Sequence, residues 1–529
     1  MKLNGLLTGH EHHVIQGDAA STRITAGTTF DVGRVVPGSL FIAVPGHRGG
    51  GPAAIGAALA RGAVAVLVDA AGAVSVPPQR ELPPSVCVVR VADTRKAAAV
   101  ASSRYFGEPG RHMDVVAVTG TNGKTSISYM VESLLRISEG ASVGVIGTAG
   151  SRIGDEVIPM PHSVLTTPES PDLQYLLGRM RDRATGSVVL EATSMALQTY
   201  RMDRTFVDVG VFTNLTQDHL DDHGTMDRYT NAKLRLFQGL CRHAVVNVDD
   251  AVGMRIRAMM PGAVTTYGLD DAEADFHAAD LVADASGTRF TLHHAGRTYA
   301  AAVPVPGRFS VSNALAAVAA CRVLGHDLEG LVAALGQMQP VPGRFERFVT
   351  PTGTSVIVDY AHSPDSLDKV LTAIRGFARG RVITVFGCGG DRDTTKRAEM
   401  GRIAGTHSDL CVLTSDNPRT EDPEAILDQI APGIAATGTP YERCADRRRA
   451  IGWALAAARP EDIVLIAGKG SEPHQIVGEE LLPFSDMATV RDLADAGPGG
   501  RSQPMPGTAE TTRSMSLMPT KGRIRPPRP

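Results

Sequence analysis

A glycine-rich turn between a short apolar run and a helical stretch constrains this chain more than any other feature. The apolar run 115–118 leads into Thr-Gly-Thr-Asn-Gly-Lys-Thr at 119–125, and a stretch with helical spacing begins at Ser126. In a strand, loop and helix of this order, backbone amides face an anion, the lysine reaches terminal phosphates and the last threonine can bind Mg²⁺. The general phosphate-loop pattern has glycine where Val118 stands. We therefore predict a variant nucleotide-binding loop, and a ligand-free turn is the alternative.

Short runs rich in Val and Ile alternate with Ala- and Leu-rich stretches of helical length along most of the chain. This alternation is typical of strands joined by crossover helices in a parallel sheet, so we predict an α/β fold. Several runs end in Gly, Asn or Asp, as strands do where their carboxyl ends form a binding site. The clearest predicted strands are 63–68, 115–118, 143–146, 188–190, 209–212, 356–358, 382–386, 410–413 and 463–466.

The length of 529 residues is typical of a protein with about three domains. Pro and Gly interrupt the helical pattern at 106–110 and again at 341–343, which places two boundaries. The end of the chain is rich in Pro, Gly, Ser and Thr and cannot bury a core, so it is predicted to be disordered; a tether for an acidic partner is the alternative. The expected units are domains at 1–108, 109–343 and 344–496 and a tail at 497–529.

The composition narrows the class of partner. The chain carries 53 Lys and Arg against 56 Asp and Glu, a net charge of -3, so nothing attracts nucleic acid or an anionic membrane over long range. A small-molecule substrate is therefore expected. The 6 cysteines are scattered without a CxxC pair, which favours reduced, mostly buried thiols. No run resembles a signal peptide or a membrane span, so we predict a cytoplasmic protein. Separately, we expect the protein to be a monomer.

Two later strand ends offer ligands for a metal ion. Glu191 follows the apolar run 188–190, and the run ending at Phe212 leads into a polar stretch that contains His219. A hard cation takes oxygen ligands or a neutral imidazole. A lone glutamate after a strand is usually a helix cap, and a lone histidine is usually structural. Beside a phosphate loop, the two are consistent with metal ions clamped between the ATP phosphates and an attacking carboxylate.

Taken together, these motifs resemble those of the Mur ligase family, and within it most closely the UDP-N-acetylmuramoyl-tripeptide synthetases. The similarity spans nearly all of residues 20–495. Residues 119–125 look like the family's ATP signature, and 213–224 with 229–233 look like its central-domain signature. The resemblance implies three domains, with a central parallel-sheet ATPase domain that carries the phosphate loop and a Rossmann-like third domain. It also implies ATP and Mg²⁺ as cofactors and a reaction through an acyl phosphate.

The resemblance assigns roles to individual residues. Lys233 would be carbamylated by carbon dioxide, which is reasonable for a lysine amine kept partly neutral by nearby cations. The family's usual adenine-contacting Asn is Ser310 here, so Asn313 is the expected contact. The implied catalytic residues are Lys124, Glu191, His219 and Lys233, and the implied metal ligands are Thr125, Glu191 and His219. The implied ATP-binding residues are Gly120, Thr121, Asn122, Gly123, Lys124, Thr125, Asn313, Arg344 and Asp359.

Three motifs of the third domain, at 387–393, 415–419 and 468–472, resemble the family's amino-acid pocket. The Asp-Asn-Pro-Arg form at 416–419 is associated with meso-diaminopimelate rather than lysine. Arg419 can bind the distal carboxylate that lysine lacks, and Glu472 can receive the distal ammonium. The alternative is that Arg419 merely pairs with Asp416 or Glu421. The implied amino-acid-binding residues are Arg392, Asp416, Asn417, Arg419, Gly468 and Glu472.

The match is poorest where the family recognises its acceptor, a UDP-sugar. The family usually has Asp-Ser-Arg where this chain has Asp-Val-Gly at 31–33, and Asp-Gly-His where it has Gly-Gly-Pro at 50–52. Val-Ser-Ser-His-Gly reads Ala-Thr-Ser-Met-Ala at 192–196. Each lost hydrogen-bonding side chain costs about 1–3 kcal/mol of binding free energy. The remaining candidate acceptor contacts are Thr166, Thr167, Ser194 and Arg201.

The sequence therefore predicts an ATP-dependent, ADP-forming ligase that adds an amino acid, expected to be meso-diaminopimelate, to UDP-N-acetylmuramoyl-L-alanyl-D-glutamate in peptidoglycan synthesis. The alternative is a paralogue that couples a similar amine to a non-UDP carboxylate in natural-product biosynthesis. A nucleotide-binding scaffold without turnover is disfavoured by the intact Lys124, Glu191, His219 and Lys233. A folylpolyglutamate-type ligase predicts a different first domain and gives no reason for the motif at 416–419.

Overall fold

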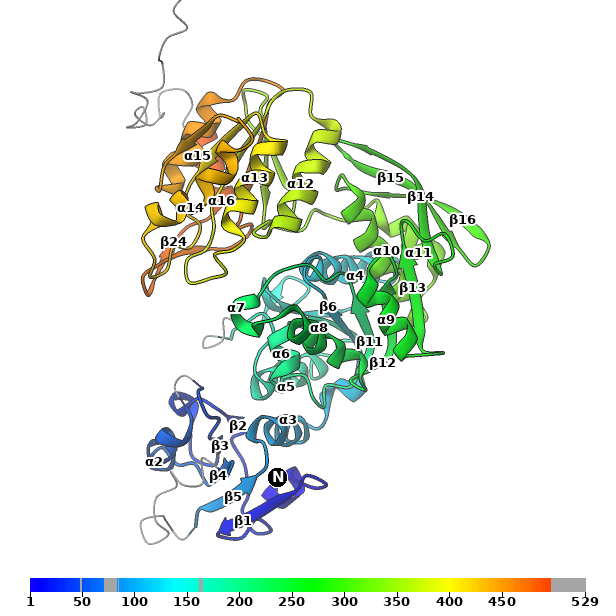
Figure 1. Cartoon of the computed structure of the whole chain (residues 1–529). Helices are drawn as coiled ribbons and strands as arrows, with labels where there is room; N and C mark the ends of the chain where they lie inside the picture. The colour runs from blue at the N-terminus through cyan, green and yellow to red at the C-terminus, as the bar shows by residue number, and fades with distance from the viewer. Residues whose placement is uncertain (48–49, 71–82, 84, 161–164, 496–529) are drawn as a thin grey trace, which may run out of the picture.

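The computed structural model describes residues 1–47, 50–70, 83, 85–160 and 165–495. Their strands form sheets of five, eleven and six strands and a separate two-stranded hairpin. Each large sheet belongs to a different part of the chain, and the three parts follow one another along an elongated molecule (Figure 1). The α/β class predicted from the sequence is confirmed. The tail predicted at 497–529 lies outside the described residues.

The N-terminal part contains a sheet in the order β1-β5-β4-β3-β2, in which β1 is antiparallel to β5 and the other pairs are parallel. The apolar side chains of the sheet pack against α3, whose N-terminus is capped by the Asp93 carboxylate. The elements are α1 Leu3–Leu6, β1 His12–Gln16, β2 Thr28–Thr29, β3 Leu40–Ile42, α2 Ile55–Ala60, β4 Ala65–Val68, β5 Cys87–Val91 and α3 Thr94–Tyr105.

The central sheet has the order β16-β15-β14-β13-β12-β11-β6-β10-β7-β8-β9. Strand β6 (Asp114–Thr119) lies between β10 and β11, parallel to both. The register pairs Glu191 with Val118 and Phe212 with Thr119. Because parallel strands end at the same edge of a sheet, the phosphate loop after β6, Glu191 and the polar stretch after Phe212 all emerge at that edge.

The remaining elements of the central part are α4 Lys124–Glu139, β7 Val143–Gly147, β8 Gly150–Ile153, β9 Glu156–Val157, α5 Ser170–Arg181, β10 Ser187–Glu191, α6 Ser194–Gln198, β11 Val207–Phe212, α7 Leu220–His223, α8 Met226–Leu234, β12 Cys241–Asn247, α9 Ala251–Met259, β13 Val264–Gly268, β14 Phe276–Asp284, β15 Gly287–His294, β16 Arg297–Val303, α10 Arg308–Val323 and α11 Leu328–Leu335.

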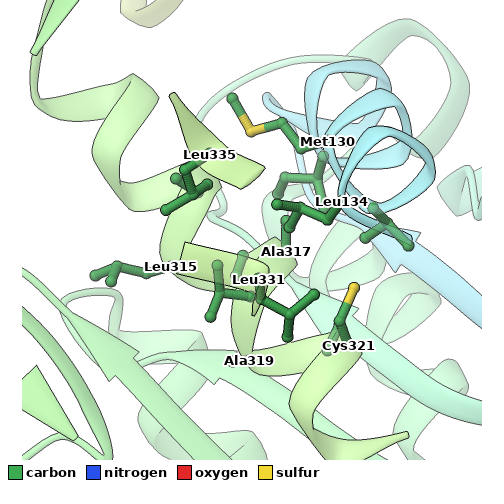
Figure 2. Close-up of a cluster of buried hydrophobic side chains, with 14 of the residues drawn as sticks. Met130, Leu134, Leu315, Ala317, Ala319, Cys321, Leu331 and Leu335 are labelled. Carbon is green, nitrogen blue, oxygen red and sulfur yellow. The ribbon is translucent and has the colours of Figure 1, made fainter. Parts of the chain in front are cut away.

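Helix α4, which follows the phosphate loop, is held in place by a buried apolar cluster (Figure 2). Met130 and Leu134 of α4 belong to one buried cluster with Ala317 of α10 and Leu331 of α11. The small alanine side chains of α10 let helices approach closely, so dispersion contacts are dense. The core thereby fixes the helix whose N-terminus faces the loop.

The C-terminal part has a sheet in the order β17-β18-β22-β19-β20-β21, parallel except for the edge strand β17. Arg447 and Asp486 form a fully buried ion pair at 2.8 Å beneath its loops. The elements are β17 Glu346–Val349, β18 Ser355–Asp359, α12 Pro364–Phe377, β19 Val382–Phe386, α13 Arg397–His407, β20 Leu410–Leu413, α14 Pro423–Ala435, β21 Tyr441–Arg443, α15 Arg447–Ala457, β22 Ile463–Ala467, β23 His474–Val477, β24 Glu480–Pro483 and α16 Asp486–Asp495.

Every run that the sequence predicted to be a strand contains a strand of the structure. All six cysteines are free, and all but the half-exposed Cys444 are buried, as predicted. Among the described helices, none combines the length and apolar character needed to cross a membrane.

Candidate active site

The phosphate loop wraps tightly against the segment that follows β11. Gly120 and Gly123 have positive φ angles of 150° and 91°. A Cβ atom on Gly120 would collide with the Thr213 side chain, and one on Gly123 would lie 2.7 Å from Asn313 Oδ1. Thr213 Oγ1 also donates a hydrogen bond to the Asn122 carbonyl oxygen at 2.6 Å. The glycines are therefore required by the fold of the loop, which lines the cavity together with the first turn of α4.

Two lysine side chains meet at the loop. Lys124 Nζ donates to the carbonyl oxygens of Gly120 and Thr121 at 3.0 and 2.9 Å, and Lys233 Nζ donates to Gly120 at 2.8 Å. Burial lowers the pKa of Lys124. Burial, and then the charge of Lys124, hold the pKa of Lys233 well below its usual value. This shift favours the neutral form of the Lys233 amine, which is the form that adds carbon dioxide.

Glu191 lines the same cavity as Lys124. Its carboxylate accepts hydrogen bonds from Thr125 Oγ1 at 3.0 Å and from Thr148 N at 2.9 Å. Arg344 Nη2, from the third part of the chain, reaches Thr125 Oγ1 at 3.0 Å. Glu191 is therefore no helix cap, because Thr193 caps α6. Thr148 was not identified from the sequence, although it follows the end of β7 at the same sheet edge.

His219 lines the same cavity as Lys124 and Glu191. Its backbone has a φ of 53°, and its ring nitrogens lie 3.7 Å from Asp218 and 3.8 Å from Asp222. Ligand atoms of His219, Asp221 and Asp222 lie within 4.8 Å of one another. The cavity itself is lined by the Glu191 carboxylate, the Thr125 hydroxyl and the His219 imidazole, ligand types that fit a hard divalent cation.

Asp218 is a buried carboxylate that the sequence did not single out, although it precedes the predicted ligand His219. Burial alone would raise its pKa, but the charges of His362, His219 and Lys396 lower the pKa to about 2. The carboxylate is therefore ionised at neutral pH. It lines both the phosphate cavity and the neighbouring cavity of the third part.

A cavity of about 110 Å³ adjoins the phosphate loop on the side of the expected adenosine. Three of the residues expected to bind ATP line this cavity: Asn313 from the central part and Arg344 and Asp359 from the third part. Asp359 accepts hydrogen bonds from Phe345 N and Ala361 N at 2.7 and 2.8 Å and so fixes the loops that carry its neighbours. Ser310 donates back to Gly307 O at 2.7 Å within its own helix start.

The third cavity, of about 180 Å³, contains the residues predicted to bind the amino acid. Arg419 Nη1 donates to the Gly390 carbonyl oxygen at 2.8 Å. The alternative prediction was that Arg419 pairs with Asp416 or Glu421. In the described residues Glu421 instead pairs with Arg397 at 2.8 Å, and Asp416 Oδ2 is buried without a hydrogen-bond partner. The cavity is lined by Asp218, His219, Asp221, Tyr360, His362, Gly389, Arg392, Asp393, Lys396, Asp416, Asn417, Arg419, Gly468 and Glu472.

Glu472 is already engaged within this cavity. Its Oε2 accepts from Lys469 Nζ at 2.7 Å and from Asn417 Nδ2 at 3.0 Å. Lys469 was missed from the sequence, although it lies in the quoted Gly-Lys-Gly-Ser-Glu motif. A Cβ atom on Gly468 would lie 2.3 Å from Asp416 Oδ2, so only glycine leaves room for that oxygen.

The predicted acceptor contacts divide into two groups. Thr166 lines the phosphate cavity. Thr167 is buried and donates to the Glu191 carbonyl oxygen at 2.6 Å, Ser194 Oγ contacts His223 Nε2 at 2.9 Å, and Arg201 donates to the Thr167 carbonyl oxygen at 3.1 Å. These last three groups hold the wall together and line none of the cavities described above.

The segment at 31–33, where the sequence departs from the family pattern, forms a local hydrogen bond and a short helix. The Asp31 carboxylate accepts from Gly33 N at 2.7 Å and caps a short 3₁₀ helix at Val32–Arg34. Arg34 forms an ion pair with Asp172 at the start of α5. The segment is thereby tied to the central part of the chain.

Comparison with known proteins matches the chain to the family that its sequence motifs resemble. Residues 118–321 match the family model of the Mur ligase middle domain, and residues 343–470 match that of the Mur ligase glutamate ligase domain. The UDP-N-acetylmuramoyl-L-alanyl-D-glutamate–2,6-diaminopimelate ligase of Caldanaerobacter subterraneus subsp. tengcongensis is 38% identical over 495 residues, which cover 93% of this chain and 99% of the relative.

Two solved structures are similar over most of their length. One is a UDP-N-acetylmuramoyl-L-alanyl-D-glutamate–2,6-diaminopimelate ligase, with a TM-score of 0.66, 32% identity and coverage of 94% of this chain and 99% of that chain. The MurF ligase of Thermotoga maritima in complex with ADP shares the fold, with a TM-score of 0.60, 18% identity and coverage of 90% and 97%.

Proposed function

This chain belongs to the Mur ligase family, and from that premise we propose that it adds meso-diaminopimelate to UDP-N-acetylmuramoyl-L-alanyl-D-glutamate at the expense of ATP, in peptidoglycan synthesis. One observation carries the proposal. The phosphate cavity and the Arg419 cavity share Asp218, His219, Tyr360 and His362 in their walls. An acyl phosphate formed in the first cavity therefore lies next to an amine held in the second.

The phosphate cavity offers a donor set that fits Mg²⁺: the Glu191 carboxylate, the Thr125 hydroxyl and the His219 imidazole. A bound Mg²⁺ ion would supply charge neutralisation for the ATP phosphates. Hydrogen bonds from Thr125 Oγ1 at 3.0 Å and Thr148 Oγ1 at 3.1 Å hold the Glu191 carboxylate, which lines the cavity. We propose these residues as the metal ligands.

In the first step, a carboxylate oxygen of the acceptor attacks the γ-phosphorus of ATP, and the bond from that phosphorus to the bridging oxygen of ADP breaks. Lys124 and Arg344 neutralise charge on the transferred group. In the second step, the amine nitrogen attacks the acyl carbon, phosphate leaves with the electrons of the C–O bond, and the nitrogen loses its proton. Amide, ADP and phosphate are the products.

Two hydrogen bonds join the central and third parts beside the phosphate loop. Asn122 Nδ2 donates to Asp365 Oδ2 at 2.7 Å, and Arg344 bridges to Thr125. Both contacts join residues of the phosphate loop region to the third part. An acyl phosphate enclosed in this way is protected from hydrolysis until the amine attacks.

A second candidate keeps the chemistry and changes the acceptor. The Asp31 carboxylate accepts a hydrogen bond from Gly33 N within its own segment. The hydroxyls of Thr167 and Ser194 form hydrogen bonds with other protein groups. These observations favour a paralogue that couples a similar amine to a non-UDP carboxylate in natural-product biosynthesis.

Phosphate release from ATP separates the candidates. We expect turnover only when UDP-N-acetylmuramoyl-L-alanyl-D-glutamate and meso-diaminopimelate are both present, with a kcat/KM for lysine lower by about 100-fold or more, because a site built around a carboxylate rejects an analogue that lacks it. The amide product is identified by mass. Turnover with other carboxylates but not with the UDP compound would favour the paralogue. If no acceptor led to phosphate release, a nucleotide-binding scaffold without turnover would be favoured.

Carbamylation of Lys233 is part of the proposal, and a rescue experiment tests it. Lys233→Ala is expected to lose about 100-fold or more in activity, because it removes an anionic group beside the phosphate cavity. Formate or acetate should restore part of that activity by placing a small carboxylate in the vacated space. Lys124→Ala is the control and should not respond to either acid. Full activity of Lys233→Ala would contradict carbamylation as a requirement.

A further inference from the structure

Arg447 is a fully buried cation that the mechanism above leaves unused. It is the first residue of α15, where a positive charge opposes the helix dipole, so the helix itself does not favour an arginine there. Its Nε and Nη2 donate to the two carboxylate oxygens of Asp486, both at 2.8 Å. Desolvating two charges offsets much of their attraction, so a buried ion pair is often no more stabilising than apolar side chains of similar size. Stability alone therefore does not explain the pair.

The guanidinium group also reaches the bases of two loops. Nη1 donates to the Ser415 carbonyl oxygen at 3.2 Å, and Nη2 donates to the Ala467 carbonyl oxygen at 2.9 Å. The residues that follow these two carbonyls, Asp416 and Gly468, line the Arg419 cavity. One planar and rigid group thus contacts the starts of both loops that carry residues of this cavity.

The C-terminal sheet does not join these two loops to each other. Their strands, β20 and β22, lie on either side of β19, and each pairs with β19 in the described sheet. The spacing between the ends of β20 and β22 therefore depends on side chains. At the cavity, Asn417 accepts from Lys469 Nζ at 2.9 Å. At the loop bases, Arg447 holds both carbonyl oxygens.

The neighbouring Arg448 shows how a surface contact between the same helices differs. Arg448 of α15 pairs with Asp492 of α16 at 3.4 Å, and the two side chains are 52% and 63% exposed. A solvated pair of this kind contributes little to stability and contacts no loop of the cavity. Arg447 joins α15 to Asp486, the first residue of α16, and in addition to the two loop bases.

We propose that Arg447 is a positioning residue for the amino-acid site: together with Asp486 it sets the spacing between the loops at 415–419 and 468–472. The proposal rests on the proposed function and extends it to a residue that is not among the described residues lining the cavity. The loops approach closely, because a Cβ atom on Gly468 would lie 2.3 Å from Asp416 Oδ2. A small change in their spacing therefore displaces the groups that contact the substrate.

Removing both partners together tests the proposal. In the double variant Arg447→Met, Asp486→Leu, two apolar side chains replace the pair and neither charge is left buried alone, so the Tm should stay close to that of the unmodified protein. We expect the KM for meso-diaminopimelate to rise by about 100-fold with little change in kcat, because displaced loops weaken binding before and during the reaction alike.

Hydroxylamine reports on the first chemical step alone. Its nitrogen attacks the acyl carbon, phosphate leaves and a hydroxamate forms, so the reaction needs no amino-acid site. In the double variant, hydroxamate formation from ATP, the acceptor and hydroxylamine should stay within about twofold of the unmodified rate. The KM for ATP should also be unchanged.

The matched control is Arg448→Met with Asp492→Leu, which removes the surface pair between the same two helices. It should leave the KM for meso-diaminopimelate unchanged. If the apolar pair unfolds, Arg447→Gln with Asp486→Asn repeats the test. Glutamine has fewer N–H donors than arginine and cannot hold residue 486 and both carbonyl oxygens at once.

The proposal is overturned if a folded double variant keeps its KM for meso-diaminopimelate. It is equally overturned if hydroxamate formation falls as steeply as amide formation, since the pair would then support the third part as a whole and not the spacing of its loops. Failure of the proposed function looks different: the unmodified protein would give neither hydroxamate nor ADP with the UDP-dipeptide.

Discussion

Replacing Lys124 by alanine is expected to slow ATP-dependent amide formation by about 1,000-fold or more. The Lys124 ammonium now rests on the Gly120 and Thr121 carbonyl oxygens, within the loop that faces the phosphate cavity. Nothing else in the loop supplies a full positive charge to the γ-phosphoryl group. The measurement is the initial rate of ADP release at saturating acceptor and amino acid.

The same variant should fold normally. Burial disfavours the charged form of Lys124, which lowers its pKa, so removing the ammonium relieves an unfavourable desolvation. Arg136→Ala is the control, because Arg136 lies on the same helix, is exposed and pairs loosely with Glu132 at 3.6 Å. If Lys124→Ala retained full activity, the loop would not be the ATP site and the assignment of the whole chain would fail.

The sequence predicted that the loop after Val118, Glu191 and the stretch after Phe212 would lie together, and the strand register of the central sheet explains why they do. The strands ending at Thr119, Glu191 and Phe212 are neighbours in one parallel sheet, and their register brings those ends to one edge. Local patterns identify buried strands, and parallel pairing then decides where their ends meet. The sequence placed Glu191 near the phosphate loop, and in the structure its carboxylate accepts a hydrogen bond from Thr125 Oγ1 at 3.0 Å.

The junction with the third part was less accessible to sequence reasoning. Asp218 and Lys396 are far apart in the chain and meet only because the third part packs onto the second. Residue type also did not show which way a hydroxyl points. Thr167 and Ser194 were expected to face the acceptor, yet the structure directs both hydroxyls into the wall. Such contacts depend on tertiary packing, which local propensity and motif spacing do not specify.

Selection of the amino acid depends on a side chain held in an unusual backbone conformation. Arg419 has a φ of 51°, and its backbone is fixed by the β23–β24 hairpin: Arg419 N donates to Ile476 O at 3.1 Å, and Gly478 N donates to Arg419 O at 2.7 Å. A non-glycine residue with positive φ is unfavourable and persists only where its surroundings enforce it. The hairpin thus positions the guanidinium in the cavity.

Arg419→Leu is expected to lower kcat/KM for meso-diaminopimelate by about 1,000-fold while changing that for lysine little, because only the first substrate has a distal carboxylate to lose. Competition between the two amino acids, with product masses as the readout, measures the ratio directly. Arg419→Lys should fall between, since a point charge cannot form the bidentate contact. Arg443→Leu, on the surface where Arg443 pairs with Asp428 and Glu424, should change neither value. An equal loss for both amino acids would mean that Arg419 supports the hairpin and does not read the carboxylate.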